Sequence, residues 1–340
     1  MISLSTWIRP WPRCNGNRNK GETDMGMWRT GIIVVGVSAV LAGAVAARQG
    51  AAPARIIVAD AKTTNHLNLY VAQERGLFRK HGLDVAIVEA RDPALARDLV
   101  ISGQADVFWS CPSVAVSAIA NGAPLKIIAQ VKAPCSSLLV VPKGSPIKSY
   151  KDLNGKRIAG SSPACEAVIA YEKKARETGA RFVLEKLAGG QAIAALDAGK
   201  VDGAILEDPH LAIAEIKGYR VVLRDAPQKF PCRTINVRTA YLKENPDALK
   251  RLVAAIREAN SFINKAPASR QVAEIALKYT GAPQQAITRA ARRFTFSDRI
   301  NEKGLNTLGE ELASLREIRE NPKDNLYAPA FKGITWGRVH

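Results

Sequence analysis

The sequence predicts an α/β fold of two lobes, each an open and mostly parallel sheet flanked by helices. Short apolar strands alternate with helical segments from residue 54 to residue 237. A glycine and an aspartate that follow a helix, Gly103 and Asp106, recur with the same spacing as Gly199 and Asp202. The chain of 340 residues is also long enough for two domains of ordinary size. These three observations favour two α/β lobes of similar construction.

A βαβ unit is expected to open the first lobe. Residues 55–59 form a short apolar strand, His66–Phe78 has the apolar spacing of a helix, and a second strand begins near Val85. The loop Asp60–Asn65 leads into the start of this helix, where backbone N–H groups can hold a small anion. The other elements expected in this lobe are helices over 94–102 and 114–120 and strands over 105–109 and 125–131.

The second lobe is expected to repeat this order. It should contain strands over 137–141, 156–160 and 181–187 and a helix over 165–178. A helix that starts at Pro246 carries an apolar stripe, and further helices are expected up to residue 320, followed by a polar tail that wraps onto the protein. We therefore divide the chain into residues 54–135 (first lobe), 136–235 (second lobe) and 236–340 (a helical C-terminal part that packs on the lobes). Lys132–Val141 and Pro231–Val237 are the candidate connections between the lobes.

Residues 1–50 are expected to be an N-terminal extension with a signal peptide or anchor. The segment Gly31–Ala47 has no charged residue, follows Arg29 and ends in small residues, as a secretory signal does. An uncleaved anchor in the inner membrane is the alternative, although the run is short for a membrane span. Met25 or Met27 would suit an export signal better as the first residue. We expect the mature protein to be periplasmic.

Composition indicates a soluble globular protein with a basic surface. Hydrophobic residues make up 47% of the chain and charged residues 24%, and the formal net charge is +18. The Lys and Arg residues are spread along the whole chain, with no basic run interleaved with aromatic residues, so we expect no nucleic-acid partner. A basic surface attracts anionic solutes or an acidic membrane surface.

Several motifs in order along the chain resemble one family of exported proteins. They lie in the segments 66–78, 81–85, 103–107, 121–129, 151–158 and 199–210. From Ala54 to Phe262 this set is similar to the nitrate-, sulfonate- and taurine-binding proteins of ABC importers, a family that also includes binders and synthases of the thiamine pyrimidine. The resemblance implies the periplasmic-binding-protein fold of type II, with the ligand in the cleft between two lobes.

The resemblance also implies a function. The protein would be the substrate-binding component of an ABC-type importer, which captures a small polar or anionic organic solute, such as a sulfonate, nitrate or taurine, and delivers it to a permease with a separate ATPase. Its lobes would close on the solute by a hinge motion. The alternatives are a binder or synthase-like enzyme of a pyrimidine precursor, and a sensor lobe tethered to the membrane. We expect a monomer without catalytic activity and without a cofactor.

Ligands of open α/β sheets bind outside the carboxyl ends of the strands, which selects the loops that follow them. The candidate ligand-binding residues in these loops are Thr64, Asn65, His66, Ser110, Cys111, Cys135, Ser161, Ser162, Cys165, Gln191 and Glu207. Any of the hydroxyl side chains could instead cap a helix. The acidic pair Glu207 and Asp208 argues against a purely anionic cleft and would suit an amino or ring nitrogen of the ligand.

Four cysteines fall in the same loops or in the connections between the lobes: Cys111, Cys135, Cys165 and Cys232. Their spacing matches no zinc or iron–sulfur motif, so we expect no metal of that kind. Three interpretations stay open. The thiols are buried without special chemistry, or they form one or two disulfides, or they line a thiol-reactive or soft-metal site.

Overall fold

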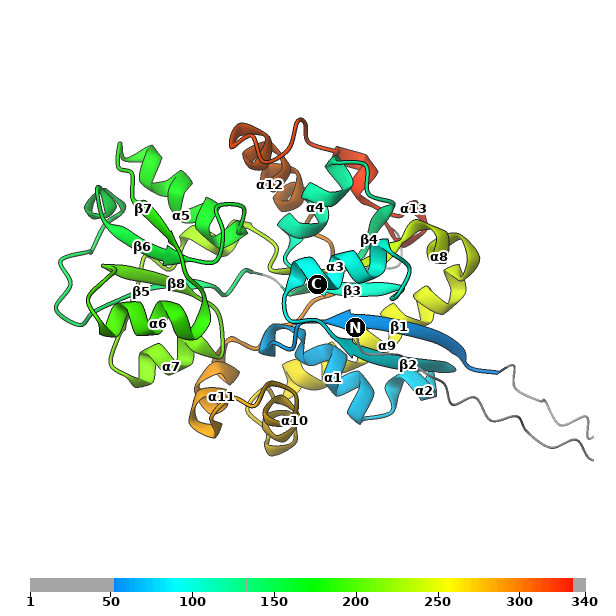
Figure 1. Cartoon of the computed structure of the whole chain (residues 1–340). Helices are drawn as coiled ribbons and strands as arrows, with labels where there is room; N and C mark the ends of the chain where they lie inside the picture. The colour runs from blue at the N-terminus through cyan, green and yellow to red at the C-terminus, as the bar shows by residue number, and fades with distance from the viewer. Residues whose placement is uncertain (1–51, 133, 333–340) are drawn as a thin grey trace, which may run out of the picture. The chain divides into compact units, whose positions relative to one another are not determined.

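The computed structural model describes residues 52–132 and 134–332, coloured in Figure 1. The expected N-terminal extension with its signal peptide or anchor, and the last eight residues of the tail, lie outside the described residues. In the part that is described, no helix combines the length and apolar character that a membrane span requires.

The first sheet has the strand order β2-β1-β3-β10-β4. Its strands are β1 (Ala54–Asp60), β2 (Leu83–Glu89), β3 (Val107–Ser110), β4 (Leu125–Lys132) and β10 (Arg233–Arg238). Only β10 runs antiparallel to its neighbours, β3 and β4. The expected α/β class and the mostly parallel strand direction are confirmed for this lobe.

The second sheet has the order β7-β6-β8-β5-β9. Its strands are β5 (Leu138–Val141), β6 (Arg157–Gly160), β7 (Val183–Lys186), β8 (Gly203–Leu206) and β9 (Arg220–Val222). Here β5 is the antiparallel strand, between β8 and β9. In each lobe the antiparallel strand is therefore the first one formed after the chain arrives from the other lobe. The described residues that cross between the lobes are 134–137 and 223–232.

The repeated Gly–Asp motif forms the same junction in both lobes. The Asp106 carboxylate accepts a hydrogen bond of 2.9 Å from the backbone N–H of Ile57 in β1. The Asp202 carboxylate accepts one of 2.8 Å from the backbone N–H of Arg157 in β6. Each aspartate thus ties the strand that it precedes to the neighbouring parallel strand. The sequence echo reflects a real internal repeat.

Helices cover the sheets (Figure 1). Those of the two lobes are α1 (Leu67–Glu74), α2 (Leu77–Lys80), α3 (Pro93–Ile101), α4 (Pro112–Ala120), α5 (Glu166–Glu177), α6 (Gly189–Asp197) and α7 (His210–Ile216). The C-terminal helices are α8 (Thr239–Glu244), α9 (Pro246–Lys265), α10 (Arg270–Thr280), α11 (Gln284–Ala290), α12 (Glu302–Ser314) and α13 (Pro329–Lys332). Short 3-10 turns are η1 (Thr64–His66), η2 (Tyr150–Leu153), η3 (Ala226–Lys229), η4 (Ala291–Arg293) and η5 (Lys323–Leu326).

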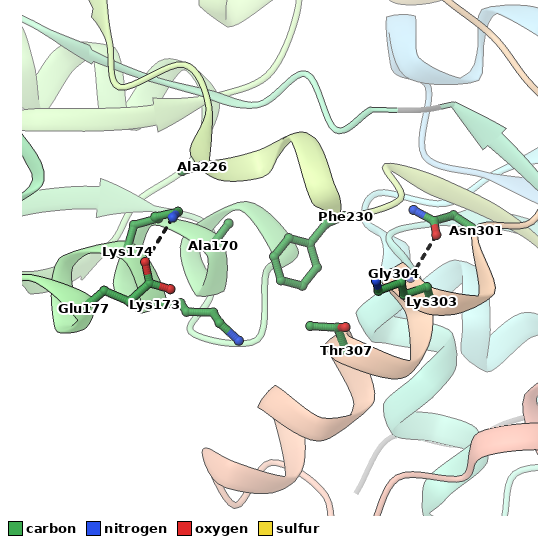
Figure 2. A pocket seen from close by; sticks show the side chains of 10 residues that line it. All are labelled: Ala170, Lys173, Lys174, Glu177, Ala226, Phe230, Asn301, Lys303, Gly304 and Thr307. Atoms are coloured by element: carbon green, nitrogen blue, oxygen red, sulfur yellow. Dashed lines mark hydrogen bonds and ion pairs between the residues drawn. The ribbon is translucent and has the colours of Figure 1, made fainter.

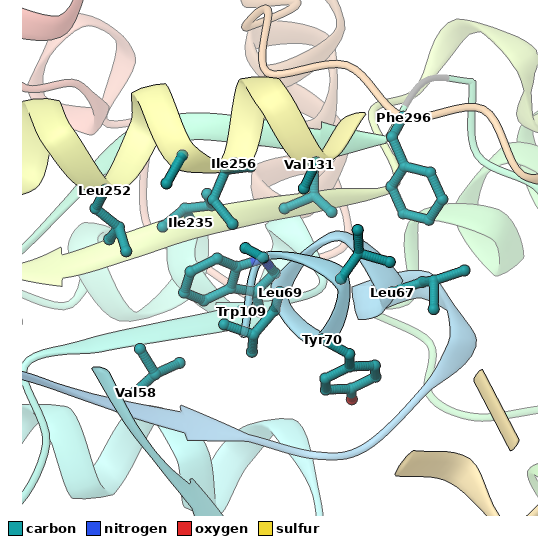
Figure 3. Close-up of a cluster of buried hydrophobic side chains, with 14 of the residues drawn as sticks. Val58, Leu67, Leu69, Tyr70, Trp109, Val131, Ile235, Leu252, Ile256 and Phe296 are labelled. Atoms are coloured by element: carbon teal, nitrogen blue, oxygen red, sulfur yellow. The ribbon is translucent and has the colours of Figure 1, made fainter. Parts of the chain in front are cut away.

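The C-terminal helices pack on both lobes. Helices α9 and α10 pack against α1, whereas α11 packs against α7 and α12 against α4. The predicted apolar stripe of α9 is buried, and Figure 3 shows Leu252 and Ile256 near Trp109 and Ile235 of the sheet. The polar tail contains buried residues that its composition did not reveal: the Ala328 N–H donates to the carbonyl of Ile127 in β4 at 3.2 Å.

Replacing Ile256 with alanine tests this core. The side chain is fully buried, so we expect Ile256→Ala to lower the free energy of unfolding by about 2–4 kcal/mol in urea denaturation. The control is Ile216→Ala, because Ile216 is 43% exposed and its truncation should change stability by about 0.5 kcal/mol or less. Equal losses for both variants would contradict the packing described.

Candidate inter-lobe ligand site

A group of mostly buried polar side chains lies between the two lobes, and we call it the inter-lobe cluster. Its members are Asp60, Thr64, Asn65, His66, Lys132, Ser136, Glu166, Glu207 and Arg233. They meet because parallel strands of both sheets end here: Asp60 ends β1, Lys132 ends β4, and Glu207 follows β8.

Asp60 orients the histidine of the cluster. Its carboxylate lies 2.6 Å from Nδ1 of His66 and accepts a hydrogen bond of 2.6 Å from the Tyr70 hydroxyl. Burial alone would raise the pKa of Asp60, but His66 and the hydrogen bonds outweigh it, so this pKa lies below its ordinary value. The other ring nitrogen of His66, Nε2, is buried and has no hydrogen-bond partner. His66 is thus held by one ring nitrogen, while the other has no partner among the described residues.

Asn65 joins the two lobes directly. Its amide nitrogen donates to Glu207 Oε2 at 2.9 Å, and its amide oxygen accepts from Lys132 Nζ at 2.9 Å. The neighbouring hydroxyl of Thr64 donates to the backbone carbonyl of Asp208 at 2.8 Å. The short turn η1 therefore contacts the second lobe through two consecutive side chains.

Arg233 lies between two carboxyl groups that differ in protonation. Its guanidinium forms a close ion pair with Glu207 and lies 3.4 Å from Glu166. Burial raises the pKa of Glu166 to about 8 despite Arg233. Burial acts in the same direction on Glu207, but Arg233, His66 and Lys132 outweigh it and lower that pKa. Glu207 is therefore the counter-ion of Arg233, and Glu166 is mainly neutral at pH 7.

Lys132 differs from the other buried cation because its hydrogen-bond partners are neutral. It is 1% exposed, and its ammonium donates to Asn65 and, at 2.8 Å, to the hydroxyl of Ser136. Within the described residues it makes no ion pair with a carboxylate. A buried ammonium whose direct hydrogen-bond partners are all neutral favours an anionic group of a ligand next to it.

Lys132 is one of the residues that line a cavity of about 440 Å³. Its charged lining residues are Lys132, Glu215, Arg224, Arg292 and Arg293. Arg293 is engaged, since it forms two hydrogen bonds of 2.7 Å with Asp208 and one of 3.0 Å with Glu215. The cavity nevertheless has more cationic than anionic side chains in its wall, which suits an anion.

A second cavity, of about 490 Å³, lies between α5, η3 and α12 (Figure 2). It contains three lysines, but Lys173 pairs with Glu311 and Lys174 with Glu177. Its floor includes the ring of Phe230. Because two of its three ammonium groups have counter-ions, this cavity is a weaker anion site than the one beside Lys132.

The remaining predicted site residues take different places. Ser110 donates to the carbonyl of Cys111 and accepts from Asn236. Cys111 and Cys165 are half-buried at the starts of α4 and α5. Ser162 accepts from the N–H of Ala164, as in a turn, and two further residues are exposed: Ser161 and Gln191.

Four charged members of the inter-lobe cluster were not predicted: Asp60, Lys132, Glu166 and Arg233. Asp60 and Lys132 end buried strands. Glu166 starts α5 and Arg233 starts β10, each directly after a cysteine. A lysine directly after the apolar run 125–131 was the clearest available signal, because charges are rarely buried without a role.

All four cysteines of the described part are free. Among the described residues, no group of three or more His, Cys, Asp or Glu side chains could hold a metal ion. In this part of the chain the cysteines therefore have no set of neighbouring ligands that would support a soft-metal site. Cys135 and Cys232 do contact each other through a thiol hydrogen bond.

A family model described as NMT1/THI5 like matches residues 63–269, which include most of this site. That range is more than half of the chain. The chain belongs to the NMT1/THI5-like family.

Curated members with similar sequences are named as enzymes of pyrimidine synthesis. The 4-amino-5-hydroxymethyl-2-methylpyrimidine phosphate synthase of Uromyces fabae is 36% identical over 97 residues, or 28% of each chain. The protein of the same name from Saccharomyces cerevisiae, THI11, is 24% identical over 219 residues, which are 59% of this chain and 64% of that protein. The matched segments thus span less than two thirds of these relatives.

Solved structures with the same fold include binding proteins. The alkanesulfonate-binding protein SsuA from Xanthomonas axonopodis pv. citri, bound to MOPS, has a TM-score of 0.68 and 20% identity and covers 82% of this chain and 98% of its own. The periplasmic aliphatic sulphonate binding protein SsuA from Escherichia coli has a TM-score of 0.73 and 18% identity, with coverages of 81% and 92%. At these identities the likeness establishes the fold, and the expected periplasmic-binding-protein architecture is confirmed.

The pKa of Glu166 predicts how stability depends on pH. Because the folded protein keeps this carboxyl protonated up to about pH 8, it binds more protons than the unfolded chain above the ordinary glutamate pKa, and stability falls as the pH rises through this window. Glu166→Gln removes that proton uptake. Between about pH 5 and pH 8 the wild type should therefore lose up to about 4 kcal/mol relative to Glu166→Gln in urea denaturation.

The matched control for this prediction is Glu244→Gln, at an exposed position of α8. Its stability should follow the wild type over the same pH range. Parallel curves for the wild type and Glu166→Gln would show that Glu166 ionises normally in the folded protein.

Proposed function

We propose that this protein is the substrate-binding component of an ABC-type importer, and that it captures a small organic anion between its lobes. The observation that carries the proposal is the buried ammonium of Lys132, which has only neutral hydrogen-bond partners beside a cavity of about 440 Å³. The shared fold with sulfonate-binding proteins supports the same role. In this proposal the protein is exported to the periplasm and delivers its solute to a permease with a separate ATPase.

The chemistry of the inter-lobe cluster favours a solute with more than an anionic group. Lys132 would hold a sulfonate or carboxylate through a charge-assisted hydrogen bond. The free Nε2 of His66 adds a further polar contact. The ionised carboxylate of Glu207 would suit an amino group or ring nitrogen of the same solute. A taurine-like aminosulfonate combines these features better than nitrate does.

Closure on the solute would use the contacts that already join the lobes. Asn65 and Lys132 belong to the first lobe and Glu207 to the second. A solute that takes over some of these hydrogen bonds stabilises the closed arrangement by its differential affinity for it. The two chain crossings, 134–137 and 223–232, would be the hinge.

A second candidate function is pyrimidine-precursor chemistry, which the names of the curated relatives suggest. The Asp60–His66 pair, with a free Nε2, is the structural feature that favours it. Such an arrangement can transfer a proton. Chemical change of a bound pyrimidine during incubation with the purified protein would support this candidate, and recovery of the same compound unchanged would support simple binding.

Thermal-shift measurements with a panel of sulfonates, taurine, nitrate and pyrimidines test the proposal. At a concentration of 100 times its dissociation constant, the right solute should stabilise the protein by about 2.7 kcal/mol, which raises Tm by several degrees. Lys132→Gln should lower the affinity for that solute at least tenfold in calorimetric titration, because the anionic group of the solute no longer has the ammonium as its partner.

The control variant for the titration is Lys200→Gln, which removes an exposed lysine of the second lobe and should leave affinity unchanged. A panel that produces no shift, or equal affinity for the wild type and Lys132→Gln, would refute the proposed anion site.

A further inference from the structure

The two chain crossings run side by side at a pair of cysteines. The backbone N–H of Cys135, in the first crossing, donates to the carbonyl of Phe230 at 3.1 Å. The backbone N–H of Cys232, in the second crossing, donates to the carbonyl of Lys132 at 3.1 Å. Both thiols therefore lie where the chain passes from one lobe to the other.

The two thiols also hydrogen-bond each other. Both are buried: Cys135 is 2% exposed and Cys232 is 0% exposed. The hydrogen bond from Cys135 lowers the pKa of Cys232 to about 5, and the nearby Arg233 and Lys132 act in the same direction against the effect of burial. The same hydrogen bond raises the pKa of Cys135. The pair thus shares one proton, and the thiolate lies on Cys232.

The other two cysteines lack such a partner. Cys111 and Cys165 lie at the starts of α4 and α5, and no thiol–thiol hydrogen bond joins them within the described residues. Burial raises the pKa of both, to about 11 for Cys165. Cys135, in contrast, lines the cavity of about 440 Å³, which gives small molecules a route to the pair.

We propose that Cys135 and Cys232 are a redox-active pair that forms a disulfide between the two chain crossings by exchange with a low-molecular-weight disulfide. Cys135, the member of the pair that lines the cavity, attacks one sulfur of that disulfide and expels the other sulfur as a thiolate, while its proton passes to the Cys232 thiolate. Cys232 then loses its proton to the expelled thiolate and attacks Sγ of Cys135, which releases the second half of the small disulfide as a thiolate that takes up a proton from water. Overall, two protein thiols are oxidised to one disulfide, and one small disulfide is reduced to two thiols.

The consequence for the lobes rests on the proposed binding function. A covalent bond between the crossings restricts the segments about which the lobes rotate. Oxidation should therefore change the affinity for the solute, since closure and binding are coupled. Formation of the disulfide itself does not depend on which solute binds.

The test uses the full chain with Cys14→Ser, which leaves Cys111, Cys135, Cys165 and Cys232 as the thiols. The protein is equilibrated with oxidised or reduced glutathione, and free thiols are counted in denaturant. We expect four thiols after reduction and two after oxidation, with a linked peptide containing Cys135 and Cys232 in mass spectrometry. Four thiols under both conditions, or a link that includes Cys111 or Cys165, would overturn the proposal.

Two further variants of this chain serve as matched controls. Cys111→Ser/Cys165→Ser should still lose two thiols on oxidation, whereas Cys232→Ser should lose none to an internal disulfide. The melting temperature of each reduced variant checks that it folds. A disulfide that forms but leaves solute affinity unchanged would refute the effect on closure, while absence of any solute binding would refute the proposed function and not the cysteine pair.

Discussion

The ion pair between Arg233 and Glu207 connects the lobes, and the other polar groups of the cluster are arranged about it. Arg233 starts β10, the strand that brings the chain back into the first sheet, and Glu207 follows β8 of the second sheet. Glu207 pairs with Arg233 and makes no ion pair with Lys132 among the described residues. Arg233 has a carboxylate partner and Lys132 has neutral partners, and this difference is the basis of the proposed anion site beside Lys132.

The internal repeat explains why these groups converge. Each sheet has four parallel strands and one antiparallel strand, which the chain forms on arriving from the other lobe. The exchange of one strand per lobe places both crossings next to each other and makes the strands of both sheets end in the same region. Asp106 and Asp202 hold the equivalent strands together within each lobe. The position of the cluster follows from this topology more than from any single loop.

Much of this arrangement could be predicted from local sequence patterns. The apolar strands, the apolar stripe of α9 and the repeated Gly–Asp junction depend on residues that are close together in the chain. The expectation that a site forms at the loops after strand ends selected Asn65, His66 and Glu207. The charged residues Lys132 and Arg233 were not predicted as site residues. Their role depends on partners more than 20 residues away, such as Asn65 for Lys132, and on burial that only the assembled fold creates. Gln191 was predicted from its loop, but its side chain is exposed on α6.

Hydrogen–deuterium exchange with and without the solute identified by thermal shift tests the central claim most directly. The account predicts that the solute slows exchange in both lobes at the inter-lobe cluster. In the first lobe and the crossing that follows it, the protected segments are 63–68 and 130–137, and in the second lobe the protected segment is 207–211. Exchange around α5 and α12, at the second cavity, should change little. Protection confined to one lobe, or centred on the second cavity, would contradict a ligand held between the lobes beside Lys132.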